Sequence, residues 1–221
     1  MKYFVIEGID KSGKSTQHKL LQKELQKRNI DSNYLFVNEP GGSAFGEKIK
    51  DIILNQNLNL SKRANFFLFL AQRAQLIETI SKEKRTIISD RSLVSGIAYA
   101  NDLSLKQALK LNLLATNYII PQKIVFLEIN KEILQARLKN KTRDNIEKNG
   151  IDYLLSIQDR FKKVLQLLES DTLLKAFKNA HGLKSPEVLY LHTSNNRYKL
   201  KKEIFNFLIK NQLKAKAINP L

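Results

Sequence analysis

The amino-acid sequence predicts an α/β fold in which helices cover both faces of a parallel sheet of about five strands. First, short apolar runs alternate with longer stretches of helical hydrophobic period along the chain. Second, a glycine-containing turn joins the first apolar run directly to the first helical stretch. Third, no stretch rich in Pro, Gly or Ser divides the chain, which predicts a single domain over residues 1–221.

The predicted strands are apolar runs with the β-branched and aromatic content of buried strands. They cover residues 3–6, 33–37, 86–89, 123–129 and 188–191. The stretches of helical period cover residues 14–28, 44–54, 62–82, 103–116, 131–138, 151–169 and 197–213. Because ligands of such sheets bind beyond the carboxyl ends of the strands, we expect the loops after the first four strands to meet at one site. These loops follow Ile6, Val37, Ser89 and Ile129.

The chain is strongly basic, with 38 Lys and Arg residues against 21 Asp and Glu residues and a formal net charge of +17. Such a balance indicates either a polyanionic partner or a lysine-biased, solvated surface. The basic residues comprise 29 Lys and 9 Arg. This bias favours the solvated surface, because Arg is preferred where phosphates and bases are bound bidentately. The composition therefore favours a solvated surface over a nucleic-acid partner, and we expect no nucleic acid among the partners unless a motif indicates one.

The chain has no Cys, which excludes disulfides, thiolate metal sites and a cysteine nucleophile. Its start, Met1-Lys2-Tyr3-Phe4-Val5-Ile6-Glu7, is too short and too soon charged for a signal peptide. No apolar run approaches the roughly 18 residues of a membrane span. The sequence thus predicts a cytoplasmic protein without a membrane anchor.

The glycine-containing turn matches the phosphate-binding pattern G-x-x-x-x-G-K-[ST] in full. Its residues are Gly8, Ile9, Asp10, Lys11, Ser12, Gly13, Lys14, Ser15 and Thr16. The N–H groups of such a loop and the N-terminus of the next helix form a concave anion site. Lys14 can reach the β- and γ-phosphates, and Ser15 can hold Mg²⁺. The loop therefore predicts a nucleoside triphosphate binder, and the lack of a strong N-K-x-D signature disfavours a GTPase.

Two residues four apart in the predicted helix 62–82, Phe69 and Arg73, share one helical face. An aromatic ring and a forked donor together suit a flat base with carbonyl oxygens. A buried Phe69 and a solvated Arg73 would give the same spacing, so the pair alone leaves both interpretations open.

Several segments in the same order and spacing resemble the thymidylate kinase family. They are Phe4-Val5-Ile6-Glu7-Gly8-Ile9-Asp10 with Lys14-Ser15-Thr16-Gln17, Glu39-Pro40-Gly41-Gly42, Phe69-x-x-x-Arg73-Ala74-Gln75, Asp90-Arg91 with Tyr99, and Asp144-Asn145-Ile146-Glu147. The resemblance implies a P-loop nucleotide kinase fold with a short basic lid at about residues 137–150. It implies transfer of the ATP γ-phosphoryl group to dTMP, giving dTDP and ADP in dTTP synthesis, with Mg²⁺.

The resemblance also implies roles around the nucleoside of the acceptor. Asp10 would bind the deoxyribose 3′-hydroxyl, Phe69 would stack on thymine, and Arg73 would reach a thymine carbonyl. Ser95 and Tyr99 would line the nucleoside pocket, with Tyr99 crowding the 2′ position so that ribose is disfavoured. The chain departs from the common family pattern at Asn38, Gln72, Gly96 and Asn145; Gly96 stands where a polar thymine contact is frequent.

A second set of implied roles concerns phosphates and metal. Arg91 would hold the dTMP phosphate, Asp90 would lie near Mg²⁺, and Glu39 would lie at the metal and phosphate face. The catalytic cations would be Lys14 and Arg91, with Arg143 of the lid reaching ATP and Lys11 supporting it. Because the acceptor phosphate, with a second pKa of about 6, is already ionised near neutral pH, no general base is required.

The sequence is also compatible with activities other than that of a dTMP kinase. One is another P-loop nucleoside monophosphate kinase or a deoxynucleoside kinase, whose hydroxyl acceptor would need a general base such as Glu39. Another is a basic P-loop nucleic-acid-binding ATPase. Members of the family are usually homodimers, and the apolar residues Phe66, Leu70, Leu76 and Ile77 would serve either that contact or the core.

Overall fold

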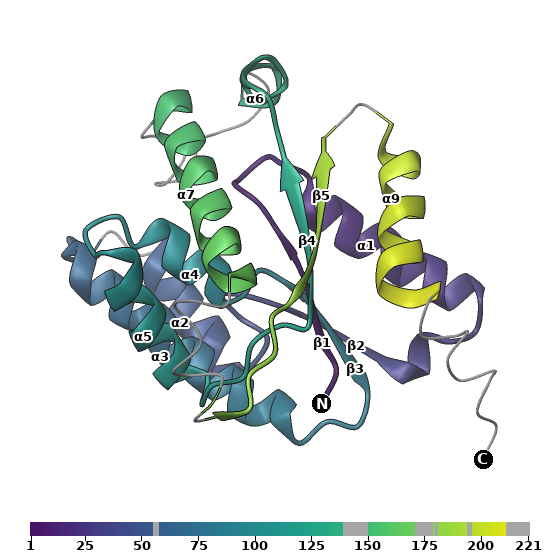
Figure 1. Cartoon of the computed structure of the whole chain (residues 1–221), viewed down its shortest axis with the longest axis horizontal. Helices are drawn as coiled ribbons and strands as arrows, with labels where there is room; N and C mark the ends of the chain where they lie inside the picture. Colours follow the sequence, from purple (N-terminus) through teal and green to yellow (C-terminus); the bar gives the residue numbers. More distant parts are fainter. Residues whose placement is uncertain (55–57, 139–149, 171–178, 180, 194–195, 211–221) are drawn as a thin grey trace.

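A computed structural model describes residues 1–54, 58–138, 150–170, 179, 181–193 and 196–210. Its sheet has five parallel strands in the order β2-β3-β1-β4-β5. The strands are β1 Tyr3–Glu7, β2 Tyr34–Asn38, β3 Thr86–Asp90, β4 Lys123–Glu128 and β5 Glu187–His192. The predicted fold class and all five strands are confirmed, with ends shifted by one residue in places. Figure 1 shows the sheet between two helical layers.

The central strand β1 is buried along its whole length. Its side chains alternate between two cores, since Val5 belongs to the core on one face and Phe4 and Ile6 to the core on the other. On the second face, α1 (Lys14–Lys27) packs beside α9 (Arg197–Phe205). This double burial is typical of a parallel sheet and explains why β1 is a continuous apolar run.

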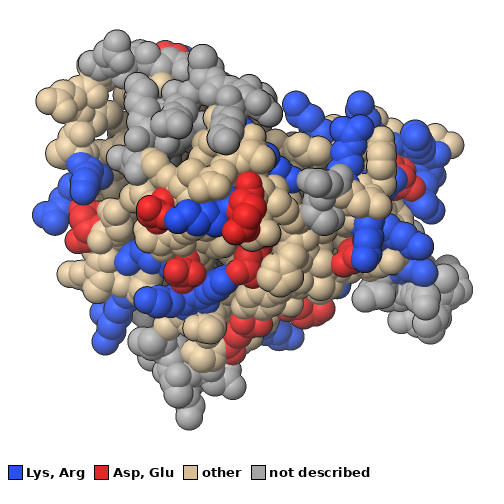
Figure 2. Space-filling model, turned by 90° about the horizontal axis from the view of Figure 1, so that it is seen from above, with Lys and Arg blue, Asp and Glu red and all other residues tan. Residues whose placement is uncertain are grey.

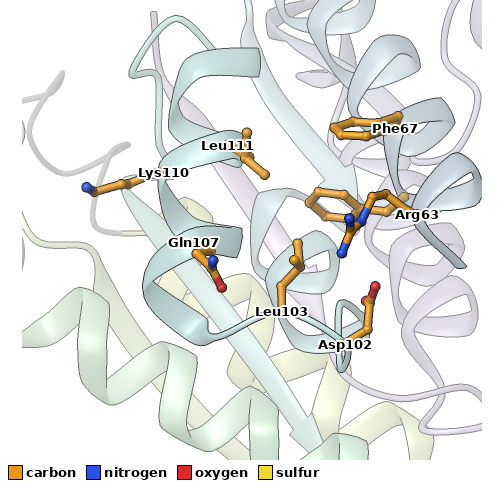
Figure 3. A pocket seen from close by; sticks show the side chains of 8 residues that line it. Arg63, Phe67, Asp102, Leu103, Gln107, Lys110 and Leu111 are labelled. Atoms are coloured by element: carbon orange, nitrogen blue, oxygen red, sulfur yellow. The ribbon is translucent and has the colours of Figure 1, made fainter.

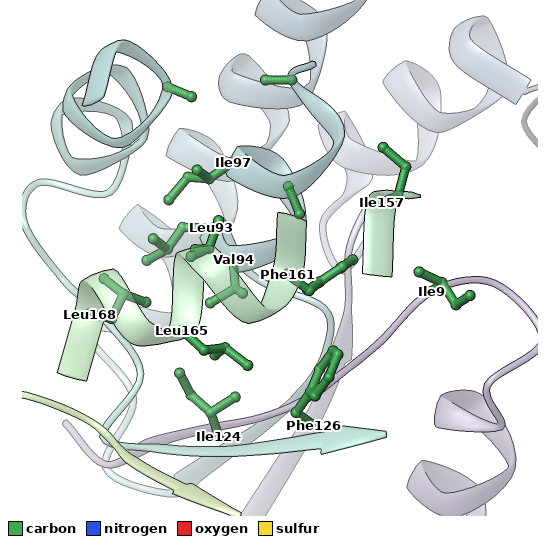
Figure 4. Close-up of a cluster of buried hydrophobic side chains, with 14 of the residues drawn as sticks. Ile9, Leu93, Val94, Ile97, Ile124, Phe126, Ile157, Phe161, Leu165 and Leu168 are labelled. Carbon is green, nitrogen blue, oxygen red and sulfur yellow. The ribbon is translucent and has the colours of Figure 1, made fainter. Parts of the chain in front are cut away.

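Most of the helical side chains of the larger core come from four helices, α3 (Lys62–Ser81), α4 (Leu93–Tyr99), α5 (Leu105–Ala115) and α7 (Ile151–Glu169). Figure 4 shows Ile124 and Phe126 of β4 beneath Phe161 and Leu165 of α7. The remaining elements are 3₁₀ helix η1 (Asp31–Asn33), α2 (Ala44–Leu54), α6 (Lys131–Leu138) and the π-helical turn η3 (Asn206–Lys210).

Helix α4 is absent from the elements expected from the sequence. Its seven residues are mostly buried, so the segment carries no alternation of polar and apolar faces that a periodicity could detect. Ser92 starts the helix, and its hydroxyl accepts a hydrogen bond from Val94 N at 3.2 Å. The final helix, expected as one continuous α-helix, also differs from the prediction. Its α-helical part ends at Phe205, and a π-helical turn follows.

The apolar residues considered for a dimer contact are core residues. Phe66 and Leu70 belong to the larger core, and Leu76 and Ile77 pack with Ile87 of β3 in a third cluster. Each is less than a tenth exposed. Core packing is therefore the correct interpretation of this pattern, and the exposed aromatic residue of the same helix is Phe67.

Candidate active site

The phosphate loop lies between β1 and α1 at the carboxyl edge of the sheet, where the chain turns sharply. Gly8 and Gly13 have φ values of 146° and 103°, and Lys11 has a φ of 64°. A Cβ atom on Gly8 would stand 2.6 Å from the carbonyl oxygen of Leu127, so the close passage of the loop past β4 needs glycine. Helix α1 begins at Lys14, which leaves its N-terminal N–H groups beside the loop.

Lys14 is buried within this loop. Its ammonium donates to the carbonyl oxygen of Ile9 at 2.8 Å and lies 4.0 Å from Asp10 Oδ1. Burial and the neighbouring Arg91 lower the pKa of Lys14 to about 8, while Asp10 and Asp90 oppose the shift. The closest acceptor of the ammonium is thus a neutral carbonyl, so the charge of Lys14 is not neutralised by a directly bonded carboxylate and can bind an anion such as a phosphate.

Ser15 and Asp90, the two residues predicted to hold metal, come together although 75 positions separate them. Ser15 Oγ donates to Asp90 Oδ2 at 2.6 Å. Asp90 is 8% exposed, and its other carboxylate oxygen has no hydrogen-bond partner among the described residues. A hydroxyl and a buried carboxylate with an unused oxygen are the kind of ligands that Mg²⁺ prefers, so these residues fit the ion.

Asp10, Arg91 and Tyr99 form a second cluster directly beside the loop. The guanidinium of Arg91 pairs with Asp10 Oδ1, and Tyr99 donates to Asp10 Oδ2 at 3.1 Å. Burial raises the pKa of Asp10, but Arg91 and Lys14 outweigh it and lower that pKa to about 2. The backbone of Arg91 has a φ of 76°, and its carbonyl oxygen accepts a bond from Ser89 Oγ at 2.6 Å. Asp10 is thus ionised, and the Arg91 side chain is held at the strand end.

Ser95 is tied to a carboxylate outside the predicted site residues, Glu7. Ser95 Oγ and Ser92 Oγ each donate to Glu7 at 2.6 Å, and Arg91 Nη1 donates to Ser95 Oγ at 3.1 Å. Glu7 is completely buried, and burial raises its pKa. Glu7 therefore fixes the start of α4 relative to β1, which orients the Ser95 and Tyr99 side of the site.

Glu39 and Arg73 form a buried ion pair, with Arg73 Nε 2.7 Å from Glu39 Oε2. Both side chains are 2% exposed, so Arg73 is not a solvated residue. Gln72 Nε2 also donates to Glu39 Oε2 at 3.3 Å, while Gln72 Oε1 accepts from Gly41 N at 3.3 Å. The neutral amide at position 72 joins α3 to the loop after β2 without adding a second carboxylate beside Glu39. Phe69, one helical turn before Arg73, is partly exposed.

Two contacts to the phosphate loop come from later segments that carry no motif. Arg137 of α6 donates from Nη1 to the Lys11 carbonyl oxygen at 2.7 Å, and Thr193 after β5 donates from Oγ1 to the Ser12 carbonyl oxygen at 3.0 Å. Arg137 was part of the lid expected at residues 137–150, but it belongs to a helix that ends at Leu138. Arg143 and most of that lid lie outside the described residues.

A separate hollow of about 440 Å³ lies on the outer side of α3 and α5. Figure 3 shows its lining, which comes from these helices and from the loop between α4 and α5. The lining residues are Arg63, Phe66, Phe67, Asp102, Leu103, Gln107, Lys110 and Leu111. None of them belongs to the clusters around the phosphate loop, so this hollow is not part of the candidate site.

Among the described residues, the Lys and Arg side chains do not form one continuous basic face at the carboxyl edge of the sheet. Seen from above that edge, acidic and basic side chains lie interspersed in Figure 2. Many of the basic groups are paired, as Lys201 is with Glu24 at 2.6 Å and Arg28 with the same carboxylate at 2.8 Å. Across the described residues, this face therefore lacks the continuous basic stripe that favours nucleic acid. None of the described helices is long and apolar enough to cross a membrane.

Comparison with known proteins gives one consistent family. The family model described as thymidylate kinase matches residues 6–181. A thymidylate kinase of Campylobacter jejuni subsp. doylei is 43% identical over 208 residues, covering 93% of this chain and 99% of the relative. A thymidylate kinase of Nautilia profundicola is 46% identical over 181 residues, covering 80% and 90%. The crystal structure of thymidylate kinase from Ehrlichia chaffeensis shares the fold, with a TM-score of 0.67, 20% identity and coverage of 93% and 97%.

Proposed function

The chain belongs to the thymidylate kinase family, and we propose that it transfers the γ-phosphoryl group of ATP to dTMP, giving dTDP and ADP for dTTP synthesis. The observation that carries the proposal is that a complete phosphate loop and the Asp10–Arg91–Tyr99 cluster share one edge of the sheet. The first can hold the donor phosphates and the second can hold the acceptor. Their contact through Asp10, which belongs to both, would place the two nucleotides end to end.

On the acceptor side, Arg91 would exchange its contact with Asp10 for the dTMP phosphate. Asp10 would then accept the deoxyribose 3′-hydroxyl, with Tyr99 and Ser95 lining the sugar and Phe69 stacking on thymine. Arg73 would donate to a thymine carbonyl, and Glu39 would support it as its buried counter-ion. Asp10 suits this exchange, because Arg91 and Lys14 hold its pKa low in the free chain and leave it an ionised acceptor at neutral pH.

On the donor side, residues 8–16 would surround the ATP phosphates, with Lys14 moving from the Ile9 carbonyl to the β- and γ-phosphates. Ser15 and Asp90 would hold Mg²⁺, which when bound neutralises charge on those phosphates. The acceptor phosphate oxygen is already ionised, so the chain needs no general base and acts by aligning two polyanions and supplying cations. A deoxynucleoside kinase would need a carboxylate base at the acceptor hydroxyl, whereas Glu39 is buried and ion-paired through Oε2 with Arg73.

Product analysis tests this function directly. The chain is incubated with ATP, Mg²⁺ and dTMP, and nucleotides are resolved by ion-exchange chromatography. Equal amounts of dTDP and ADP are expected. ADP with free phosphate and no dTDP would contradict the proposal, and phosphate release that rises with added DNA would favour a nucleic-acid-dependent ATPase.

We expect a homodimer in the cytoplasm, with dTMP and ATP as the only nucleotide partners. A light-scattering mass of two chains in solution supports the dimer, and a mass of one chain contradicts it. Since Phe66, Leu70, Leu76 and Ile77 are buried, exposed apolar residues such as Phe67 would have to make the contact.

The source of the additional cation near ATP is tested by matched alanine variants. We expect Arg143→Ala to lower kcat by about 10²-fold or more, because a cation on the transferring group has a large effect. Lys11→Ala should lower kcat less. Steady-state kinetics at saturating ATP and dTMP give both values, with Lys19→Ala, an exposed lysine of α1, as control. If Lys11→Ala alone is impaired, the lid assignment is wrong.

The pKa of Lys14 predicts an alkaline limb in the pH profile. Only the protonated ammonium attracts phosphates, so kcat/KM for ATP should fall about tenfold per pH unit above a pH of about 8. Bound phosphates raise the pKa of Lys14, so kcat should fall only at higher pH. A Lys14→Arg variant should be less active but lack this limb, because guanidinium does not titrate there. A profile of kcat/KM that stays flat to a pH of about 10 would contradict the assignment.

The contribution of Lys14 to folding stability should change with pH in the direction opposite to kcat/KM. The ordinary pKa of Lys14 is 10.5 and its folded pKa is about 8, so between these values the unfolded chain binds more protons at this position. The contribution of Lys14 to the free energy of unfolding therefore rises with pH in that window. Loss of kcat/KM there is thus not expected to come from unfolding through this group.

A further inference from the structure

Gly96 on α4 stands against the guanidinium of Arg73. A Cβ atom at this position would lie 2.6 Å from Asn112 Oδ1, 3.0 Å from Arg73 Cζ, and closer still to Arg73 Nη1. Gly96 lies inside the helix Leu93–Tyr99, where any residue can adopt the backbone conformation. Position 96 therefore has to be glycine because a side chain would not fit there. The space is occupied by Arg73 of α3 and Asn112 of α5, which contact each other.

That contact is a hydrogen bond from Arg73 Nη1 to Asn112 Oδ1 of 2.7 Å. Asn112 is completely buried, and its Nδ2 donates to the Ala108 carbonyl oxygen at 2.8 Å, which turns the side-chain oxygen toward Arg73. The guanidinium also donates from Nε to Glu39 and from Nη2 to the Ser92 carbonyl oxygen at 3.1 Å. Acceptors from three separate parts of the chain thus fix the plane of the guanidinium.

The number of donors matters for function. A guanidinium has five N–H groups, and the three bonds to described residues use one on each nitrogen. One N–H on Nη1 and one on Nη2 are left over, and their directions are set by the acceptors already bound. Among the described residues, Glu39 is the one carboxylate that Arg73 contacts, since the Asn112 oxygen is a neutral amide oxygen. The two remaining N–H groups can therefore donate to a carbonyl oxygen of a ligand.

We propose that Asn112 is a positioning residue that orients Arg73 toward the base of the acceptor nucleotide, and that Gly96 leaves the room that this pair needs. The inference rests on the proposed function, in which Arg73 contacts the base. A side chain at position 96 would displace the Arg73–Asn112 pair, so the two positions act as one unit. Base recognition in this chain then depends on an asparagine of α5 that does not itself touch the base.

A double-mutant cycle between Gly96 and Asn112 tests the proposal. Asn112→Ala should raise KM for dTMP about tenfold, the effect of one lost buried hydrogen bond, with kcat and KM for ATP within about twofold. Gly96→Ala should raise KM for dTMP at least as much, although it removes no polar group. In the double variant the increase should be smaller than the product of the two, because alanine in place of Asn112 vacates the space that the new methyl group enters.

The matched control is Thr116→Ala, which removes another buried polar group at the end of α5, one that bonds to the Leu113 carbonyl oxygen and not to Arg73. It should leave KM for dTMP unchanged. Equal increases in KM for dTMP and ATP, or a multiplicative double variant, would overturn the proposal. If Asn112→Ala does not fold, Gly96→Ala carries the same prediction, and an unchanged KM for dTMP in that variant would overturn it.

Failure of the proposed function would appear as no dTDP formed by the parent chain, and failure of the role of Arg73 has a different signature. An Arg73→Ala variant with unchanged KM for dTMP would remove Arg73 from the base site. An increased KM for dTMP in Arg73→Ala, together with no effect at Asn112 or Gly96, would retain the function and reject the positioning role.

Discussion

Replacing Lys14 with Met is expected to lower kcat/KM for ATP by about 10³-fold or more, the largest effect of any single substitution in this chain. The side chain of Lys14 is 5% exposed, and its ammonium bonds in the free chain to a neutral carbonyl, so it is available to the donor phosphates. Methionine keeps the length and apolar volume of the stem and removes the charge.

The matched control for this substitution is Lys19→Met, on the exposed side of the same helix, which should leave kcat/KM within about twofold of the parent chain. Thermal unfolding should show no loss of stability for Lys14→Met, because burial disfavours the charged form that the substitution removes. Activity of Lys14→Met within about tenfold of the parent would contradict the role of the loop in binding ATP.

Replacing Arg91 with Gln is expected to raise KM for dTMP and lower kcat together, with kcat/KM for dTMP reduced about 10³-fold. Arg91 is partly buried, and its side chain lies between Asp10 and Ser95 at the end of β3, where an acceptor phosphate would approach the donor. Glutamine can still donate a hydrogen bond but supplies no charge, so the orientation of the phosphate and its neutralisation are both lost.

Steady-state kinetics with dTMP as the varied substrate measure this effect. Arg85→Gln is the control, since Arg85 pairs with Glu83 near the surface at 2.8 Å and lies before β3. Ion-pair loss at such a site has little effect on activity or stability. An Arg91→Gln variant that loses affinity for ATP but not for dTMP would place Arg91 on the donor side and reject the proposed acceptor role.

The parts of the site that sequence could predict are local. The phosphate loop is one continuous motif, and its position between an apolar run and a helix follows from neighbouring residues alone. Ser15 was assigned to Mg²⁺ from the loop pattern and Asp90 from the family resemblance, and the two side chains are in contact in the structure. The strand order places β1 between β3 and β4, which brings Asp90 beside the loop.

The parts that sequence could not predict depend on contacts between distant residues. Arg73 bonds to Glu39 and Asn112, which are 34 and 39 positions away, and no spacing rule connects them. Glu7 is followed at once by the motif, but its partners Ser92 and Ser95 are 85 and 88 positions away. For Gly96 the one available signal was a side chain missing where polar residues are frequent, and the positions of Arg73 and Asn112 explain it.

Only a few of the basic residues are proposed to bind nucleotides. The cations proposed to act on nucleotides are Lys14, Arg73 and Arg91, with Lys11 and Arg143 near ATP. Arg137 adds a described contact to the loop at the Lys11 carbonyl oxygen. Other basic groups pair with carboxylates near the surface, such as Lys131 with Asp152 at 3.0 Å. The polyanions that this chain is proposed to bind are two small nucleotides held at one edge of the sheet.

The central claim is that the acceptor is a phosphorylated thymine deoxynucleoside. Its most direct test is a comparison of kcat/KM for dTMP, dUMP, UMP and thymidine with saturating ATP and Mg²⁺. Phosphorylation of dTMP should be fastest; UMP should be strongly disfavoured by Tyr99 at the sugar, and thymidine should be inactive because Arg91 then has no phosphate to hold. Phosphorylation of thymidine as fast as dTMP would contradict the assignment of the Asp10–Arg91–Tyr99 cluster and the proposed function with it.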